Sequence, residues 1–306
     1  MLTCSPLREA RVRIPLPTLM LPFYFLYEKL LERRIRRSQT PSHLLLVLNE
    51  ADILPDETDE TDETGRTGKT GKTERAGRGV FGGGGRKERS GKRGERGGRR
   101  KKRSGFDGAE KLRQFVRWCH SLRIEEVSIY IGLIREANGR RLESALLEKA
   151  CERIVERVSE VLRGEDAFVA IYAAPHDSRF YARFFFGGKK TTAKECEGRK
   201  RKIIVSVGLG GKSELTRAFR ALATKVRSGE IEPAEINEKM LEDALIFKSE
   251  PELIIRSGST RLTDFLIWQS VYSELYFTDV NWRKFRRIDL LRAVRDFQMR
   301  ERRFGR

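Results

Sequence analysis

The sequence is poor in the residues that mark a metal site, a disulfide framework or a membrane span. Its 306 residues include four cysteines and three histidines, scattered without the close spacing that a zinc site requires. The most apolar N-terminal stretch, residues 14–27, contains three prolines, and it is shorter than the roughly 20 residues of a membrane-spanning helix. We therefore expect reduced thiols, no zinc site and a cytoplasmic protein.

Acidic residues are too few to balance the basic ones, and the imbalance is concentrated in one segment. The chain has 63 Lys and Arg against 44 Asp and Glu, a net charge of +19, and residues 65–105 contribute +13 of it together with 14 of the 27 glycines. Residues 56–63 carry −6. Because neither stretch has apolar periodicity, we expect residues 56–105 to be a disordered, low-complexity insertion.

Residues 1–40 are expected to form an N-terminal helical segment on the surface. The sequence at 24–37, YFLYEKLLERRIRR, places apolar side chains on one helical face and basic ones on the other. Such a helix can lie on an anionic membrane, or it can pack on the main domain with its charges in water. Both alternatives remain open from the sequence.

Residues 41–305 are expected to form the main domain, with strands that alternate with helices. Short apolar runs at 44–48, 127–131, 167–173, 203–207 and 253–255 indicate strands, and 179–186 is a further candidate. Helical periodicity is present at 108–122, 142–162, 213–226, 233–245 and from 287 onward. This alternation predicts an α/β fold, a single domain with a central, mostly parallel sheet flanked by helices.

Ligands of such sheets bind at the carboxyl ends of the strands, where two segments look suited to phosphate. RSGSTRLT at 256–263 offers Arg256, Arg261 and Thr263 near an expected helix start. The same pattern also fits surface ion pairs and a helix cap. The glycines of GLGG at 208–211 form a weaker phosphate loop without Walker spacing. Glu274, in a strand-like segment, is either a Mg²⁺ ligand or an edge-strand charge.

Together these segments resemble the cis-prenyltransferase family, which includes undecaprenyl diphosphate synthases, in their archaeal-type form. The resemblance rests on ELIIRSGSTRLTDFLIWQSVYSELYF at 252–277, FQMRERRFG at 297–305, LGGKSEL at 209–215 and GAEKLRQFVRWC at 108–119. It implies a domain with an apolar tunnel for the growing chain, working as a homodimer or as a heterodimer with a second cis-prenyltransferase subunit.

The resemblance also implies roles for individual residues. Arg256, Arg261 and Thr263 would bind isopentenyl diphosphate, Glu274 would bind Mg²⁺, and Arg303 and Gly305 would reach the substrate of a neighbouring subunit. Further substrate contacts would come from three positions: Gly210, Gly211 and Arg140. In the family reaction, the isopentenyl double bond attacks an allylic diphosphate, the diphosphate leaves, and proton loss gives a Z double bond, which requires charge stabilisation and positioning.

The allylic half of the site departs from the family pattern. After the first strand the family carries Asp-Gly-Asn-Arg-Arg, and this chain has NEADI at 49–53 instead. Asn49 stands at the position of the metal-binding and catalytic Asp, and the acidic loop repels phosphate where the family loop attracts it. The family's Phe-Ser-x-Glu-Asn motif is reduced to GLIRE at 132–136, with Glu136 and Arg140 at the family's mutual spacing after one inserted residue.

Three functions therefore remain open. The chain is a catalytic cis-prenyltransferase that makes a long-chain Z-polyprenyl diphosphate, with Asp52 or Asp56 for the metal in place of the missing Asp and Lys and Arg of the insertion for the allylic diphosphate. Alternatively, it is a subunit that supports a catalytic partner. In the third, the basic insertion binds RNA or an anionic membrane. Because residues 86–105 contain no aromatic side chain for base stacking, peripheral membrane contact is the more economical expectation and nucleic acid is the less expected partner.

Overall fold

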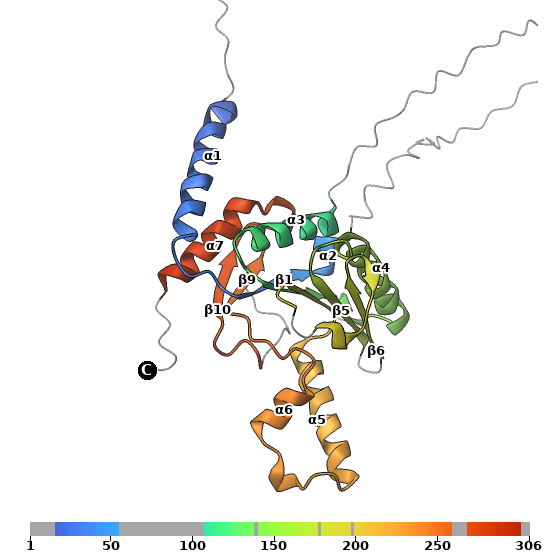
Figure 1. Ribbon diagram of the computed structural model, residues 1–306. Helices are drawn as coiled ribbons and strands as arrows, with labels where there is room; N and C mark the ends of the chain where they lie inside the picture. The colour runs from blue at the N-terminus through green and yellow to red at the C-terminus, as the bar shows by residue number, and fades with distance from the viewer. Residues whose placement is uncertain are drawn as a thin grey trace, which may run out of the picture. The chain divides into compact units, whose positions relative to one another are not determined.

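The computed structural model describes residues 16–54, 107–137, 140–176, 179–196, 199–258 and 268–300 (Figure 1). The side chains of residues 16–24, 136–141 and 195–196 lie outside this description. The described residues belong to one unit, which excludes the expected insertion. The segment at 49–54 and the helix that starts at Gly108 meet directly, because a Cβ on Gly108 would clash with the backbone oxygen of Asp52.

The centre of the domain is an eight-stranded sheet in the order β10-β9-β1-β2-β8-β5-β6-β7. Neighbouring strands are parallel from β10 to β5, and β6 and β7 are antiparallel additions at one edge. The strands are β1 (His43–Asn49), β2 (Glu126–Gly132), β5 (Phe168–His176), β6 (Arg179–Phe186), β7 (Lys189–Lys190), β8 (Lys202–Val207), β9 (Leu253–Ser257) and β10 (Glu274–Thr278). The expected mostly parallel α/β sheet is confirmed.

The central strands are the most apolar ones because both of their faces are covered. All five residues of the run at 44–48 are at most 1% exposed, and β1 pairs with β2 on one side and β9 on the other. Continuous apolar runs of this length are typical of parallel strands that are buried on both faces. A separate two-stranded ribbon is formed by β3 (Glu136–Ala137) and β4 (Arg140–Arg141).

Helices α3 (Gly108–Ser121) and α4 (Ser144–Leu162) pack side by side, and α4 contacts β5. Phe115 of α3 contacts Trp282 and Phe285 edge-on, with ring centroids 5.8 and 5.9 Å away. The indole of Trp282 also donates a hydrogen bond of 3.1 Å to the oxygen of Gly108. This aromatic cluster joins α3 to the segment that leads into α7 (Arg287–Met299).

Helix α1 (Leu16–Ile35) packs on α7, where Leu31 and Ile35 are buried. Arg287 of α7 binds the carboxylates of Glu28 and Glu32 at 2.8 and 3.0 Å. This face of α1 agrees with the expectation of a helix packed on the main domain. The helix starts earlier than the pattern at 24–37 indicated.

Helices α5 (Gly211–Arg227) and α6 (Glu238–Ala244) pack against each other around Ala218, Leu222 and Leu241. The expected helix at 233–245 is instead a short 3₁₀ turn, Pro233–Glu235, followed by α6. Asn237 separates the two, because its side chain accepts the backbone N–H of Met240 and so caps a new helix. No helix within the described residues combines the length and apolar character that a bilayer span needs.

Candidate functional site

The carboxyl ends of β1, β2 and β8 surround a cavity of about 280 Å³. Asn49 ends β1, Gly132 ends β2 and Gly208 follows β8, and all three line the cavity. The remaining lining residues are Tyr130, Leu133, Ile134, Arg135 and Gly210. The cavity therefore lies where ligands of parallel α/β sheets bind.

Arg256 is the central cation beside this cavity. It lies on β9 next to β1 and is 2% exposed, and its guanidinium donates to the oxygen of Val47 at 3.2 Å and to Oδ1 of Asn49 at 3.1 Å. Its Nε is buried and has no hydrogen-bond partner within the described part of the chain. Burial lowers the pKa of Arg256, and the carboxylate of Asp52 opposes that shift.

The loop after β1 is organised by its own acidic residues. A carboxylate oxygen of Asp52 accepts the backbone N–H of Asn49 at 2.9 Å across the short helix α2 (Glu50–Ile53). A carboxylate oxygen of Glu50 accepts the N–H of Ile134 at 3.0 Å and so joins this loop to the one after β2. Burial raises the pKa of Asp52, against the opposing effects of the Asn49 N–H and Arg256.

The turn at 208–211 forms the next wall of the cavity. Gly208 has a φ of +71°, and a Cβ there would lie 2.6 Å from Leu133 Cδ1 and 2.7 Å from the oxygen of Ala174, so the position requires glycine. Arg135 donates to the oxygen of Gly208 at 2.7 Å. Gly210 precedes α5 without a side-chain cap, which leaves N–H groups at this helix end for other acceptors.

The structure brings together Asn49, Arg256 and Gly210 from the predicted site residues, and Gly211 opens α5 directly afterwards. Arg140 lies in β4, where its backbone pairs with Ala137, and its side chain is outside the described part. Four predicted site residues also lie outside the described residues: Arg261, Thr263, Arg303 and Gly305. Their roles stay predictions.

Glu274 lies at the amino end of the edge strand β10. It starts β10 and pairs in register with Leu253, whereas Arg256 pairs with Phe277. Three residues of strand separate the two positions by about 10 Å. The carboxylate of Glu274 accepts a hydrogen bond of 2.8 Å from Arg300. The described residues contain no group of three or more His, Cys, Asp or Glu side chains arranged to hold a metal ion.

Sequence reasoning missed the wall residues Tyr130 and Arg135. Tyr130 sits inside a buried apolar strand, where no polar pattern marks it. Arg135 follows that strand within the GLIRE segment, so its position at a strand end could have identified it.

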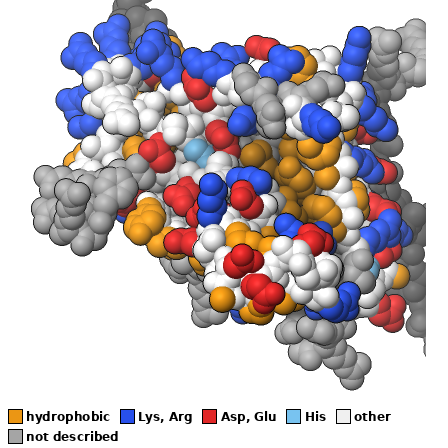
Figure 2. Space-filling view, turned by 60° about the horizontal axis from the view of Figure 1, so that its bottom comes forward, with side chains coloured by type: hydrophobic (Ala, Val, Ile, Leu, Met, Phe, Trp, Pro, Cys, Tyr) orange, Lys and Arg blue, Asp and Glu red, His pale blue; other side chains and the backbone are white. Residues whose placement is uncertain are grey.

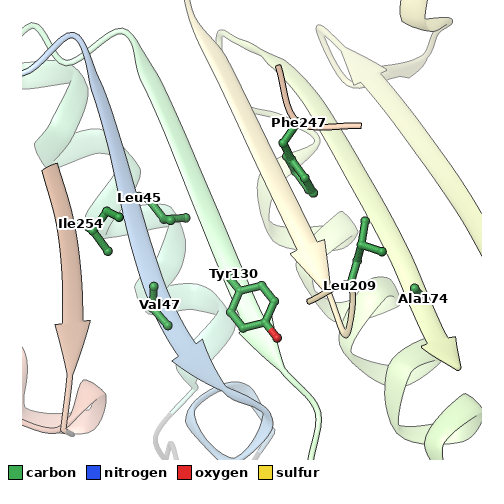
Figure 3. Packing of buried hydrophobic residues seen from close by; sticks show 7 residues of the cluster. All are labelled: Leu45, Val47, Tyr130, Ala174, Leu209, Phe247 and Ile254. Atoms are coloured by element: carbon green, nitrogen blue, oxygen red, sulfur yellow. The ribbon is translucent and has the colours of Figure 1, made fainter. Parts of the chain in front are cut away.

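Buried apolar side chains cover the face of the sheet next to the cavity (Figure 3). The cluster consists of Leu45, Val47, Tyr130, Ala174, Leu209, Phe247 and Ile254, with Tyr172, Phe180 and Ile204 among the partly buried neighbours. Tyr130 belongs to both the cluster and the cavity wall. Figure 2 shows one area of gathered hydrophobic side chains with charged ones around it. The apolar tunnel that the family resemblance implied stays a prediction.

Comparisons with known proteins agree on one family. A family model described as "Putative undecaprenyl diphosphate synthase" matches residues 92–305. The match begins after β1, so Asn49 lies outside it. Among curated proteins, the tritrans,polycis-undecaprenyl-diphosphate synthase (geranylgeranyl-diphosphate specific) of Methanopyrus kandleri is 39% identical over 202 residues, 65% of this chain and 74% of the relative. The protein of the same name from Methanocaldococcus jannaschii is 37% identical over 210 residues, 65% and 72% of the two chains.

A solved structure of lavandulyl diphosphate synthase from Lavandula x intermedia, in complex with dimethylallyl diphosphate, matches with a TM-score of 0.49 and 19% identity. The match covers 87% of this chain and 99% of that chain. The family assignment rests on the family model and the curated relatives. The chain belongs to the undecaprenyl diphosphate synthase family of cis-type prenyltransferases.

Proposed function

We propose that this chain condenses isopentenyl diphosphate onto an allylic diphosphate and releases a long-chain Z-polyprenyl diphosphate. The observation that carries this proposal is the buried guanidinium of Arg256, which donates a hydrogen bond to the side chain of Asn49 at the wall of the cavity. A guanidinium fixed beside a cavity at the carboxyl ends of parallel strands is suited to attract the oxygens of a diphosphate. Because the curated relatives act with geranylgeranyl diphosphate by name, we propose this compound as the allylic starter.

The chemistry needs two diphosphates held close together and the leaving charge stabilised. Arg256 supplies a fixed positive charge at the carboxyl ends of β9 and β1, and Asn49 orients that guanidinium through its amide oxygen. Arg261 and Thr263 would complete the isopentenyl diphosphate site. The apolar cluster beside the cavity would shield the prenyl chain from water.

Prenyltransferases of this kind generally use a divalent metal, and the described residues fit one mode of binding it. Mg²⁺ commonly takes one or two protein carboxylates and completes its shell with phosphate oxygens and water. Asp52 is a carboxylate on the loop after β1 and would hold the ion, which would neutralise diphosphate charge. Glu274, the ligand that the family resemblance implies, is occupied by Arg300 at the other edge of the sheet, so we give it no step in the reaction.

The proposal is tested by supplying the purified full chain with Mg²⁺, radiolabelled isopentenyl diphosphate and geranylgeranyl diphosphate. We expect extraction of labelled polyprenyl product from the wild type. Absence of product would refute autonomous catalysis.

The acidic loop at residues 49–52 favours a second candidate, a subunit of a heteromeric cis-prenyltransferase. In that case the chain would contribute its dimer face and the Arg303–Gly305 tail to a partner that retains the family Asp. Product that forms only after a second homologue is added would support this alternative, and sedimentation of the chain alone would show whether it is a homodimer.

We also propose peripheral contact with an anionic membrane, through the exposed side of α1. Phe25, Leu26 and Leu30 are 61%, 57% and 49% exposed, and Arg33 and Arg34 follow in the last turn of the helix. Apolar and basic side chains on one exposed surface are typical of interfacial helices. Cosedimentation with vesicles that contain anionic lipid, and not with neutral ones, should be lost in Leu26→Glu/Leu30→Glu; unchanged cosedimentation would refute this role of α1.

A further inference from the structure

An open groove of about 750 Å³ lies between the first turn of α3 and the segment that leads from β10 into α7. It shares no lining residue with the cavity at the ends of β1, β2 and β8. We name it the basic groove, because four of its lining residues are basic and one is acidic. These five residues are Lys111, Arg283, Lys284, Arg286 and Asp279.

One wall of the basic groove is fixed to the sheet and closed by its own hydrogen bonds. Ser257, the last residue of β9, donates from Oγ to the oxygen of Val280 at 2.7 Å. The side chain of Asn281 accepts the backbone N–H of Lys284 at 3.1 Å and so caps the short 3₁₀ turn Trp282–Lys284. The backbone of this turn is therefore ordered before any partner binds, which lowers the entropic cost of binding.

Lys111 of α3 forms the other wall. Its ammonium group donates to the backbone oxygen of Arg283 at 2.9 Å and lies over the ring of Trp282, 5.5 Å from the centroid. Burial lowers the pKa of Lys111, and the carboxylate of Asp289 opposes that shift. An anion in the groove would likewise favour the charged form of this partly desolvated lysine.

Carboxylates balance only part of the positive charge around the groove. Asp279 is one of the lining residues, and the buried Asp289 lies 3.9 Å from Nε of Arg286. Arg283 and Lys284 are exposed on the 3₁₀ turn. The four basic side chains thus outnumber the two carboxylates near them, and a net positive charge remains for an anionic partner.

The exposed apolar side of α1 lies close to the basic groove. Arg286 lines the groove, and its neighbour Arg287 binds Glu28 of α1 at 2.8 Å. Phe25, one helical turn before Glu28, is 61% exposed. Figure 1 shows α1 beside α7, on the same side of the sheet as α3. Exposed apolar side chains and a basic groove therefore occur together on this side of the domain.

This combination fits the surface of an anionic bilayer. Lys and Arg attract the phosphate headgroups of anionic lipids, and exposed apolar side chains of an adjacent helix enter the boundary between headgroups and acyl chains. None of the described residues that line the basic groove is aromatic, so the groove has no side chain on which a nucleic acid base could stack. A complex with nucleic acid would also leave the apolar side chains of α1 in water.

We propose that the basic groove binds the phosphate headgroups of anionic phospholipids and holds the bilayer against α1, α3 and the start of α7. This inference rests on the membrane contact of α1 proposed above and adds a second, electrostatic contact to it. Two linked contacts strengthen each other, because the first makes the second intramolecular. They also fix the orientation of the domain on the membrane.

Cosedimentation of the full chain with vesicles tests the headgroup site. The vesicles contain phosphatidylcholine alone, or phosphatidylcholine with phosphatidylglycerol. We expect the wild type to bind only the anionic vesicles, and Arg283→Gln/Lys284→Gln to bind them at least about tenfold more weakly, since two cations near the lipid phosphates are lost. The matched control is Lys225→Gln/Arg227→Gln, which removes the same charge from exposed positions in the last turn of α5. It should bind like the wild type.

Three results would overturn the groove. The first is an equal loss of binding in both double variants, which would show attraction by net charge alone. The second is wild-type binding of anionic vesicles by Arg283→Gln/Lys284→Gln. The third is binding of a labelled single-stranded RNA that depends on these two residues while vesicle binding does not. If circular dichroism shows that the double variant does not fold, Lys284→Gln decides, because this exposed side chain alone should account for at least about threefold.

The variant Leu26→Glu/Leu30→Glu separates the groove from the membrane role of α1. If it binds anionic vesicles like the wild type and Arg283→Gln/Lys284→Gln does not, the role of α1 fails and the headgroup site stands. If only the α1 variant loses binding, the headgroup site fails and the contact of α1 stands. A wild type that binds no anionic vesicles overturns both.

The elongation assay, performed without vesicles, keeps catalysis apart from membrane binding. If the wild type makes no product but its vesicle binding depends on Arg283 and Lys284, the proposed catalysis fails and the headgroup site stands. If product forms and vesicle binding does not depend on these residues, catalysis stands and the headgroup site is overturned.

Discussion

Glu214 of α5 binds the backbone of the segment at 246–247, and its removal should destabilise the domain. The side chain is 2% exposed. One carboxylate oxygen accepts the backbone N–H groups of Ile246 and Phe247 at 3.0 and 2.9 Å, and the other accepts Nε2 of Gln269 at 3.2 Å. Through Phe247, these bonds fix a member of the apolar cluster beside the cavity.

The expected magnitude follows from the groups that lose their partner. Glu214→Ala leaves two backbone N–H groups without an acceptor, and each buried, unsatisfied group costs about 1–3 kcal/mol. Because the N–H of Ile246 is only partly buried, we expect a loss of about 2–4 kcal/mol from a total of about 5–15 kcal/mol. Glu214→Gln retains the carbonyl oxygen for both N–H groups and loses the bond from Gln269, so it should cost about 1 kcal/mol or less.

Urea unfolding of the three proteins at pH 7, followed by circular dichroism, measures the difference. The decisive result is the gap between the two variants, because both remove the charge and only Glu214→Ala removes the acceptor. If Glu214→Ala were no less stable than Glu214→Gln, the hydrogen bonds from the segment at 246–247 to Glu214 would not stabilise the domain.

Three further predictions concern pH, the turn at Gly208 and the isopentenyl diphosphate site. Burial raises the pKa of Glu214 above the ordinary value of 4.5, so the folded state binds more protons than the unfolded state just above that pH. The stability contributed by Glu214 therefore falls as pH rises through this window and then levels off. The stability of Glu214→Gln relative to wild type should increase with pH, and a constant difference in urea midpoints would contradict this. Gly208→Ala should lower the thermal midpoint and cost at least about 1 kcal/mol, since its Cβ would approach Leu133 and the oxygen of Ala174 within 2.7 Å; an unchanged midpoint would contradict the contact. Arg261→Ala should abolish product formation while the circular dichroism spectrum is retained, and retained turnover would remove Arg261 from the site.

Local pattern was sufficient for the fold wherever burial alone decides the structure. The apolar run at 44–48 predicted a buried parallel strand, and the helical periodicity at 108–122 predicted α3, because each pattern states which face meets the core. The periodicity did not predict a helix boundary that depends on a single capping residue. The 233–245 segment reads as one helix, and the side chain of Asn237 ends that continuity by capping a new helix at Met240.

The sequence also placed the strand ends at the site, but it could not supply the order of the strands. Asn49 and Arg256 are 207 residues apart and meet because β9 lies next to β1. The position of Glu274 depends on the register of a single strand. Since it precedes the apolar residues of β10 rather than following them, it belongs to the amino end of that strand, and that distinction was available from the sequence.

The loop after β1, residues 49–52, is ordered by its own side chains. Its two carboxylates accept backbone N–H groups of Asn49 and Ile134, and its amide orients Arg256. An Asp at position 49 would add a negative charge next to Asp52, whose pKa burial already raises, and would not create a phosphate-binding loop.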